Sequence, residues 1–104
     1  MTVLAIDVMG GDEAPDVCIE GISMFYKNYP DTHFLLFGNE EVVRPLLDRH
    51  KDIENACRMI HTTEYISSHT KPSSAVRQFP RSSMRLALEA VATKQAHGAV
   101  SAGN

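Results

Sequence analysis

Short apolar segments alternate with segments of helical periodicity along this chain, and that alternation restricts its fold more than any other feature. Four segments are expected to be strands: residues 3–9 (VLAIDVM), 33–38 (HFLLFG), 57–64 (CRMIHTTE) and 98–104 (GAVSAGN). The first is apolar nearly throughout, as expected of a strand covered on both faces. Strands that alternate with helices predict an α/β fold in three layers, with a mainly parallel sheet and helices on both faces.

Three segments between these strands have the spacing of amphipathic helices. Pro15 suits the first helical position, and Pro30 ends the first helix. Asn39 is the expected N-cap of the second helix, in which Pro45 predicts a kink or a late start. The predicted buried faces are Cys18, Ile22, Phe25 and Tyr29, then Val43, Leu46, Leu47 and His50, and finally Met84, Ala87, Leu88 and Val91.

The composition, 43% hydrophobic and 22% charged over 104 residues, is that of an ordinary globular protein of at most one small domain. No apolar run approaches the ~20 residues of a membrane span, and no basic residue precedes the first apolar run as in a secretory signal. Two isolated cysteines fit reduced thiols in a cytoplasmic protein. Because the chain stops at the end of a strand, we expect residues 1–104 to be the amino-terminal part of a larger α/β domain, without an internal boundary.

The net charge of −3 conceals an asymmetry. Residues 1–64 hold 12 Asp/Glu and 5 Lys/Arg, a net −7, whereas residues 65–104 hold 1 Asp/Glu and 5 Lys/Arg, a net +4. No carboxylate lies between Tyr65 and Leu88, where four of these cations fall. This segment is either a site for a small anionic ligand or a solvated basic face. Nucleic-acid binding is not expected, because the chain as a whole has no basic excess.

The stretch DVMGGDEAP (7–15) leaves the first strand through two adjacent glycines. Gly10 and Gly11 either supply the positive φ of a tight turn or let a ligand approach bare backbone at the carboxyl edge of the sheet. The stretch SAGN (101–104) forms a second turn of this kind at the same predicted edge. Neither the G-x-G-x-x-G fingerprint nor the P-loop pattern occurs, so neither dinucleotide nor P-loop nucleotide binding is indicated.

A loop rich in Ser, Thr and Pro, with a short helix expected at 73–79, precedes RSSMR (81–85). Ser82 and Ser83 are either caps of the third helix or part of a phosphate site, together with Arg85 and the first N–H groups of that helix. Arg85 could grip two phosphate oxygens. Lys71, before a proline, is either a point charge in the same site or a solvated loop lysine.

Two carboxylates near the first turn need an explanation. Asp7 lies in an apolar strand, so we expect it to accept backbone N–H groups and fix the loop. Asp12 either holds the turn or orients a ligand. The five histidines show no metal-ligand spacing, and no G-x-S-x-G nucleophile elbow occurs. Neither a metal site nor an acyl-enzyme mechanism is therefore indicated.

Three separated motifs, AIDVMGGDEAP (5–15), KPSSAVRQFPRSSMRLALEAV (71–91) and AVSAGN (99–104), resemble the amino-terminal part of the PlsX family of phosphate acyltransferases. The resemblance covers essentially the whole chain. It implies transfer of a fatty acyl group from acyl carrier protein to inorganic phosphate in bacterial phospholipid synthesis, without metal or organic cofactor. It also implies a cytoplasmic homodimer that works near the membrane surface, with a fold like isocitrate and isopropylmalate dehydrogenases.

The resemblance implies which residues bind phosphate or substrate, and it leaves the catalytic acid or base unassigned. The matching positions are Gly10, Gly11, Asp12, Lys71, Ser82, Ser83, Arg85, Ser101, Gly103 and Asn104. The chain departs from the family pattern at Glu13, where His is usual, so we assign no proton-transfer role there. It also departs at His69 and around Gln78.

Two other functions stay open at this point. A related enzyme such as a phosphate acetyltransferase would use coenzyme A thioesters instead of acyl carrier protein. Alternatively, the chain could be a non-catalytic ligand-binding or assembly segment, which catalytic turnover would exclude. A nucleotide-binding regulatory domain is disfavoured by the missing glycine fingerprint.

Overall fold

The computed structural model describes residues 1–11, 14–64 and 81–101. Within them the elements follow in the order β1 (Thr2–Asp7), α1 (Asp16–Asn28), β2 (Thr32–Gly38), α2 (Glu40–Asp48), the 3₁₀ helix η1 (Glu54–Ala56), β3 (Cys57–His61), α4 (Ser83–Ala92) and β4 (Gly98–Ser101). The short helix expected at 73–79 lies outside the described residues.

The sheet is parallel, and its strands lie side by side in the order β3-β2-β1-β4. β1 is therefore an inner strand, and its last residue, Asp7, pairs with Phe37 of β2 and with Ser101 of β4. The prediction of an α/β fold with a parallel sheet is confirmed. Because β1 and β4 are neighbours, their carboxyl ends lie side by side.

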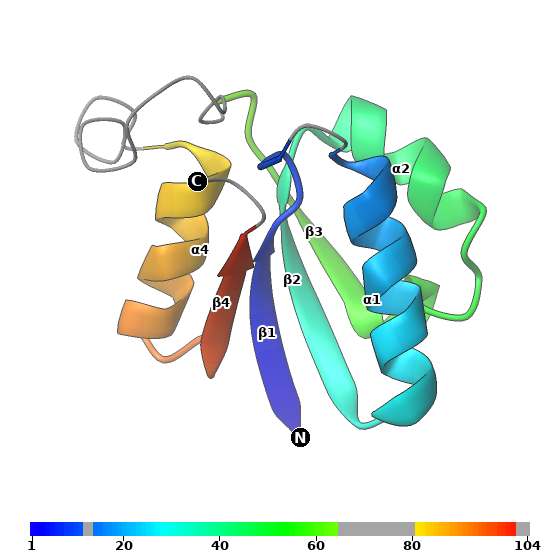
Figure 1. The fold of residues 1–104 in the computed structure, drawn as a ribbon. Helices are drawn as coiled ribbons and strands as arrows, with labels where there is room; N and C mark the ends of the chain where they lie inside the picture. The colour runs from blue at the N-terminus through cyan, green and yellow to red at the C-terminus, as the bar shows by residue number, and fades with distance from the viewer. Residues whose placement is uncertain (12–13, 65–80, 102–104) are drawn as a thin grey trace.

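The helices lie on opposite faces of the sheet because the chain reverses its direction of travel. From β1 to β3 it moves outward through α1 and α2, and it then returns through α4 to β4. Right-handed crossovers that run in opposite directions place their helices on opposite faces. Figure 1 shows α1 and α2 on one side of the sheet and α4 on the other. Between β1 and β4, therefore, the connecting helices change from one face of the sheet to the other.

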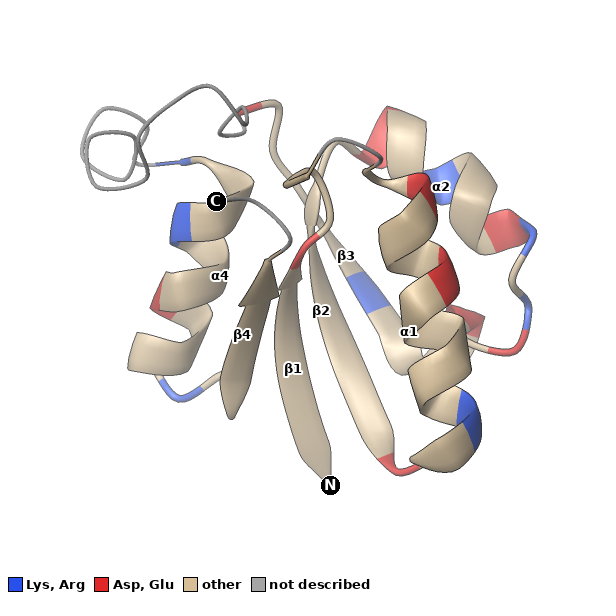
Figure 2. Cartoon of the chain, viewed as in Figure 1, with Lys and Arg blue, Asp and Glu red and all other residues tan. Residues whose placement is uncertain are grey.

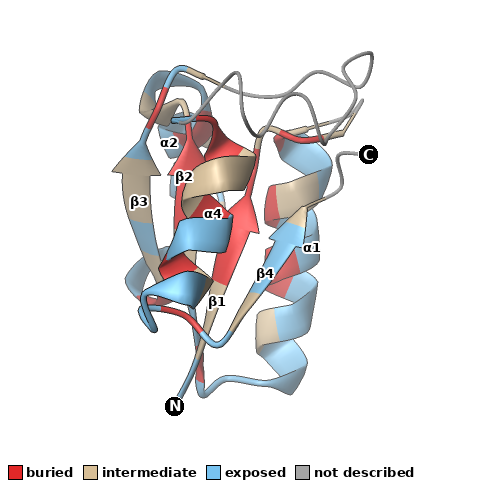
Figure 3. Ribbon diagram, turned by 90° about the vertical axis from the view of Figure 1, so that its left-hand side faces the viewer, coloured by how far each residue is buried: buried red, intermediate tan, exposed pale blue. Residues whose placement is uncertain are grey.

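The sheet divides the core into two clusters. The larger, under α1 and α2, contains Ile6 and Phe34, and the smaller, under α4, contains Ala5, Phe37 and Ala87. Successive strand residues point to opposite faces, so the neighbours Ala5 and Ile6 belong to different clusters. Figure 3 shows burial concentrated in β1 and β2, the two inner strands. Burial of β1 on both faces matches its continuous apolar sequence.

The buried face of α1 differs from the predicted one. Its buried residues are Ile19, Ile22 and Ser23. Phe25 and Tyr29, predicted to be buried, are 40% and 58% exposed. Their rings stack on each other instead, with centroids 4.7 Å apart. A wide apolar stripe does not reveal which of its sides meets the sheet, so periodicity alone chose the wrong side.

A similar correction applies to α4. Ser83, Ala87 and Ala90 are its buried residues, whereas Leu88 of the predicted stripe is 48% exposed and the stripe's outer two members are half-buried. Small side chains on the inner face let the helix backbone lie close to the sheet. The prediction placed the buried face of α4 wrongly because it relied on the large apolar residues.

The start of α2 agrees with the sequence, and its proline does not delay it. The Asn39 side chain accepts a hydrogen bond from the backbone of Glu41, which confirms it as the N-cap. The helix begins directly after Asn39 and contains Pro45, so a late start was wrong. The cap stabilises the first turn that the proline would otherwise weaken. Of its predicted face, Val43 and Leu47 are buried, whereas His50 lies beyond the helix end.

The ends of two strands and the start of α1 also differ from expectation. β1 ends at Asp7 and β3 at His61, two and three residues earlier than predicted. After β1 the backbone N–H of Met9 donates to the Asp7 side chain, and after β3 that of Glu64 donates to the Thr62 side chain, so these groups bond locally instead of extending the sheet. Pro15 immediately precedes α1, and its carbonyl accepts a hydrogen bond from Ile19. None of the helices described here is both long and apolar enough to cross a membrane.

Candidate functional site

The candidate site lies where β1 and β4 end side by side. In open α/β sheets, ligands bind outside the carboxyl ends of the strands at the point where the strand order reverses. Here that point lies between β1 and β4, because the connection that leaves β1 passes through α1 on one face of the sheet and the connection that leads into β4 passes through α4 on the other. The predicted glycine turn follows β1, and the start of α4 lies at the same edge (Figure 1).

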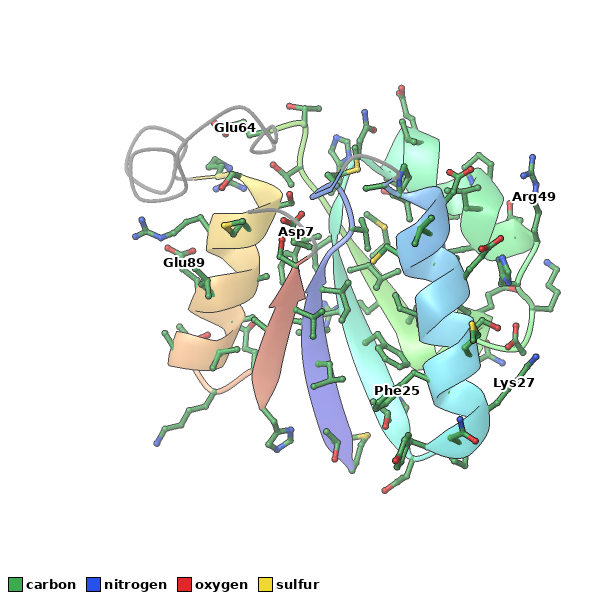
Figure 4. The ribbon with its side chains drawn as sticks, viewed as in Figure 1. Asp7, Phe25, Lys27, Arg49, Glu64 and Glu89 are labelled. Atoms are coloured by element: carbon green, nitrogen blue, oxygen red, sulfur yellow. The ribbon has the colours of Figure 1, made fainter. Side chains whose placement is uncertain are left out.

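Asp7 organises this edge (Figure 4). Its Oδ1 accepts hydrogen bonds from the backbone N–H groups of Met9 and Gly10, each at 3.1 Å, and from the hydroxyl of Ser83. Its Oδ2 accepts a hydrogen bond from the hydroxyl of Ser101 at 2.7 Å. The side chain is buried, with 1% of the residue exposed. The prediction that Asp7 accepts backbone N–H groups and fixes the loop is confirmed.

The start of α4 is held by a second set of hydrogen bonds. The Ser82 hydroxyl accepts a hydrogen bond from the backbone of Arg85 at 3.2 Å, which confirms Ser82 as the cap. The Ser83 backbone donates to the carbonyl of Glu64 at 2.9 Å. Both serines are fully buried. Their role in phosphate binding stays a prediction.

Thr62 ties β3 to the segment before α4, and the sequence patterns do not single it out. Its hydroxyl donates to the carbonyl of Arg81 at 2.6 Å and accepts from the backbone of Glu64 at 3.3 Å. Its own backbone N–H donates to Gly38. The available signal was the run of polar residues directly after an apolar strand, a position at which side chains commonly bond to backbone.

Arg85 lies in the first turn of α4, close to this junction. Its guanidinium lies 3.4 Å from the carboxylate of Glu89, and its side chain is 37% exposed. Figure 2 shows basic residues at the start of α4, opposite the acidic helices α1 and α2. Such an exposed ion pair contributes little to stability. The other predicted cation, Lys71, lies outside the described residues.

The turn after β1, which contains Gly10 and Gly11, includes a positive φ angle. Gly11 has a φ of 98°, which a residue with a side chain rarely adopts, so at this position the turn requirement is confirmed. Gly10 is buried and donates to Asp7. The ligand-binding role of both glycines stays a prediction, and Asp12 lies outside the described residues.

The structure thus brings together the larger part of the predicted site. Asp7 and its contacts connect the loop of Gly10 and Gly11 with Ser83 and Ser101, while Ser82 and Arg85 lie in the same first turn of α4. Asp12, Lys71, Gly103 and Asn104 fall outside the described residues. No group of His, Cys, Asp or Glu suited to a metal ion occurs in the described part of the chain.

An apolar cavity of about 510 Å³ adjoins this site on the face covered by α1. Its walls include Leu4, Cys18 and Phe25, and it shares Gly11 and Ser101 with the candidate site. At Gly21, a helical residue that also lines the cavity, an added Cβ would meet no atom within 4 Å. The space next to Gly21 is therefore open.

The two thiols are protonated under ordinary conditions. Burial, and then the charge of Asp7, raises the pKa of Cys18 to about 11. Burial, followed by the charges of Asp52 and Cys18, raises the pKa of Cys57 to about 12. A thiol is a poor nucleophile when it is not ionised. Neither cysteine is therefore an activated nucleophile.

These thiols predict a loss of stability at alkaline pH. Folding raises both pKa values above the ordinary 9.0, so their contribution is complete below about pH 9 and is lost as the pH rises toward the folded values. Between about pH 9 and 11, the free energy of unfolding should fall more steeply for the wild-type chain than for Cys18→Ala/Cys57→Ala. Urea unfolding at a series of pH values checks this. Equal slopes would contradict it.

Comparison with known proteins gives one consistent result. The chain matches the profile of a family described as fatty acid synthesis protein over residues 2–104. It is 46% identical over 101 residues to a protein of Paramagnetospirillum magneticum named phosphate acyltransferase, covering 97% of this chain and 29% of that protein. Relatives of the same name from Rhodospirillum rubrum and Gluconobacter oxydans are each 43% identical, over 98% and 97% of this chain and 29% and 27% of their own lengths. The chain therefore spans less than a third of these relatives.

Proposed function

The chain belongs to the fatty acid synthesis protein family, and on that premise we propose that it forms part of an enzyme that transfers a fatty acyl group from acyl carrier protein to inorganic phosphate. The relatives' shared name, phosphate acyltransferase, supports an acyl transfer involving phosphate. The observation that carries the proposal is the junction at Asp7, which gathers a glycine turn, a helix N-terminus and a strand end at the switch point of the sheet. Each of these is a favourable setting for an anion.

The reaction proposed is attack of a phosphate oxygen on the carbonyl carbon of a thioester. A new C–O bond forms and the C–S bond breaks. The proton that hydrogen phosphate loses passes to the thiolate of the carrier protein, which leaves as its thiol while acyl phosphate is released. The protein's task is to hold the phosphate in line with the carbonyl and to stabilise the oxyanion that develops. The backbone N–H groups of Gly11 in the glycine turn and of Met84 in the first turn of α4 supply donors, and Arg85 supplies positive charge. This chemistry requires neither a metal nor an organic cofactor.

The proposal extends to the setting of the enzyme. Residues 1–104 form the amino-terminal segment of a larger catalytic domain, with a three-layer fold like isocitrate and isopropylmalate dehydrogenases. The enzyme is a cytoplasmic homodimer that works close to the membrane surface in phospholipid synthesis. The resemblance of the sequence motifs supports these statements, and the helices on both faces of the parallel sheet agree with the fold.

The test uses a chimera in which this chain replaces the matching segment of the Paramagnetospirillum magneticum relative. Formation of acyl phosphate is measured with palmitoyl-acyl carrier protein and inorganic phosphate, and again with palmitoyl-coenzyme A. We expect turnover that prefers the carrier protein. Arg85→Ala should raise the KM for phosphate by about tenfold, because a charge-assisted contact to the anion is lost.

Arg44→Ala is the matched control. Arg44 forms an exposed ion pair with Glu40 on α2, spaced four residues apart as in the pair of Arg85 with Glu89. It should leave the KM for phosphate unchanged. An unchanged KM for phosphate in Arg85→Ala would show that Arg85 does not contact the phosphate and that the phosphate site lies elsewhere. A folded chimera that is inactive with both thioesters would contradict the proposed function. A preference for palmitoyl-coenzyme A would show that the acyl donor is a coenzyme A thioester and not acyl carrier protein.

A further inference from the structure

Asp7 joins three segments that are far apart in the sequence. Its carboxylate receives two N–H groups from the turn after β1, one hydroxyl from Ser83 at the start of α4 and one from Ser101 at the end of β4. Ser83 is 76 residues from Asp7 in sequence, and Ser101 is 94. The carboxylate is buried, so water does not compete for these donors. One side chain thus sets the positions of the turn, the helix start and the strand end relative to one another.

The hydrogen atoms at this junction limit what the serines can do. A serine hydroxyl has one hydrogen to donate, and an ionised carboxylate only accepts. Ser83 and Ser101 both donate their hydrogen to Asp7, so neither hydroxyl can donate to an anion in this arrangement. The same count applies to the backbone, because the N–H groups of Met9 and Gly10 donate to Asp7 and those of Ser83 and Arg85 donate to Glu64 and Ser82. Among the described residues of the turn and of the first turn of α4, the N–H groups of Gly11 and Met84 are therefore the donors that can face an anion.

We propose that Asp7 is the positioning residue of the phosphate site, and that Ser83 and Ser101 act through Asp7 instead of binding phosphate with their hydroxyl hydrogens. This inference rests on the proposed function. A phosphate held by N–H groups depends on their directions, because hydrogen bonds weaken steeply when they are bent. The four donors also disperse the negative charge of Asp7, which would otherwise repel a neighbouring anion.

The test measures three constants separately in the chimera: kcat, the KM for phosphate and the KM for palmitoyl-acyl carrier protein. Asp7→Asn keeps the shape of the side chain but replaces an accepting oxygen by a donating amide. We expect the KM for phosphate to rise by about tenfold or more, while the KM for the acyl donor is unchanged. A purely structural defect would reduce the amount of folded enzyme and hence the apparent kcat, and would change neither KM.

Asp52→Asn provides a matched control. The hydroxyl of Ser23 donates to Asp52 at 2.6 Å, which is the same pairing of serine and carboxylate outside the candidate site. This variant should have the KM values of the wild-type chimera. If Asp7→Asn also keeps the wild-type KM for phosphate while the wild-type chimera makes acyl phosphate, the positioning role is overturned and the proposed function stands. Absence of acyl phosphate from the folded wild-type chimera rejects the function itself, and the inference with it.

A double-mutant cycle separates action through Asp7 from direct contact with phosphate. If Ser83 acts through Asp7, Ser83→Ala adds little to the KM for phosphate once Asp7→Asn is present. Effects that multiply would show that the Ser83 hydroxyl binds phosphate itself, which overturns the proposal. Should Asp7→Asn not fold, Ser83→Ala and Ser101→Ala carry the test: each is expected to raise the KM for phosphate alone, and unchanged values in both would overturn the proposal.

Discussion

Replacing Phe34 by alanine is expected to lower the free energy of unfolding of the chain by about 3–5 kcal/mol. Phe34 is 2% exposed in the larger core cluster, and its ring meets the edges of Phe25 and Tyr26 at centroid distances of 6.3 and 6.4 Å. The substitution removes the apolar contacts and leaves a cavity that the sheet and α1 fill only in part. A loss of this size is a large share of the ~5–15 kcal/mol by which domains are stable.

The measurement is urea unfolding of the wild-type chain, Phe34→Ala and Phe25→Ala. Phe25 is the matched control because it is an aromatic residue of the same cluster of rings but is 40% exposed. Its removal should cost clearly less. Equal losses in the two variants would contradict the placement of Phe34 in the core and of Phe25 at its margin.

The second large effect is expected at Gly38, the last residue of β2. A Cβ at this position would lie 2.5 Å from a methyl group of Val8 and 2.9 Å from Cγ of Met9. Val8 is fully buried and its β-branched side chain is stiff, so it cannot move aside. Gly38→Ala should therefore destabilise the chain by about 1–3 kcal/mol. It should also displace the residues that lead into the glycine turn.

Gly21→Ala is the control for the loss of a glycine as such. An added Cβ at this position meets no atom within 4 Å, and alanine favours a helix by about 1 kcal/mol over glycine. The midpoint of thermal unfolding should fall for Gly38→Ala and rise for Gly21→Ala. Shifts of the same sign in both variants would contradict the packing described at Gly38.

Local features of the sequence predicted local structure well. The sequence predicted Asn39 as a cap and offered Ser82 as one of two candidate caps, because a capping side chain acts within three residues of its own position. The parallel sheet followed from the alternation of apolar and amphipathic segments. The buried sides of α1 and α4 were wrong because they depend on contacts with strands distant in sequence. Phe25 has the right spacing for the core, but Ile19 and Ser23 are buried instead, and Phe25 is 40% exposed.

In the candidate site, too, the local features could be predicted from the sequence and the contacts between distant segments could not. Gly11 and Asp7 could be interpreted from their immediate neighbours, since a turn needs a positive φ and a buried carboxylate needs donors. The sequence does not reveal that two of those donors are the hydroxyls of Ser83 and Ser101, because that requires knowing which strands and helices lie beside β1. Strand order is a property of the whole chain.

The central position of β1 also has a consequence for the order in which the protein folds. β1 pairs with β2 across a connection of only one helix, whereas its pairing with β4 and the bonds of Asp7 close loops that include almost the entire chain. Closing a longer loop costs more chain entropy, and contacts between distant residues slow folding. We therefore expect the junction at Asp7 to form among the last events. A chain that is still being synthesised has the first strand and the glycine turn long before it has the serines that hold them in place.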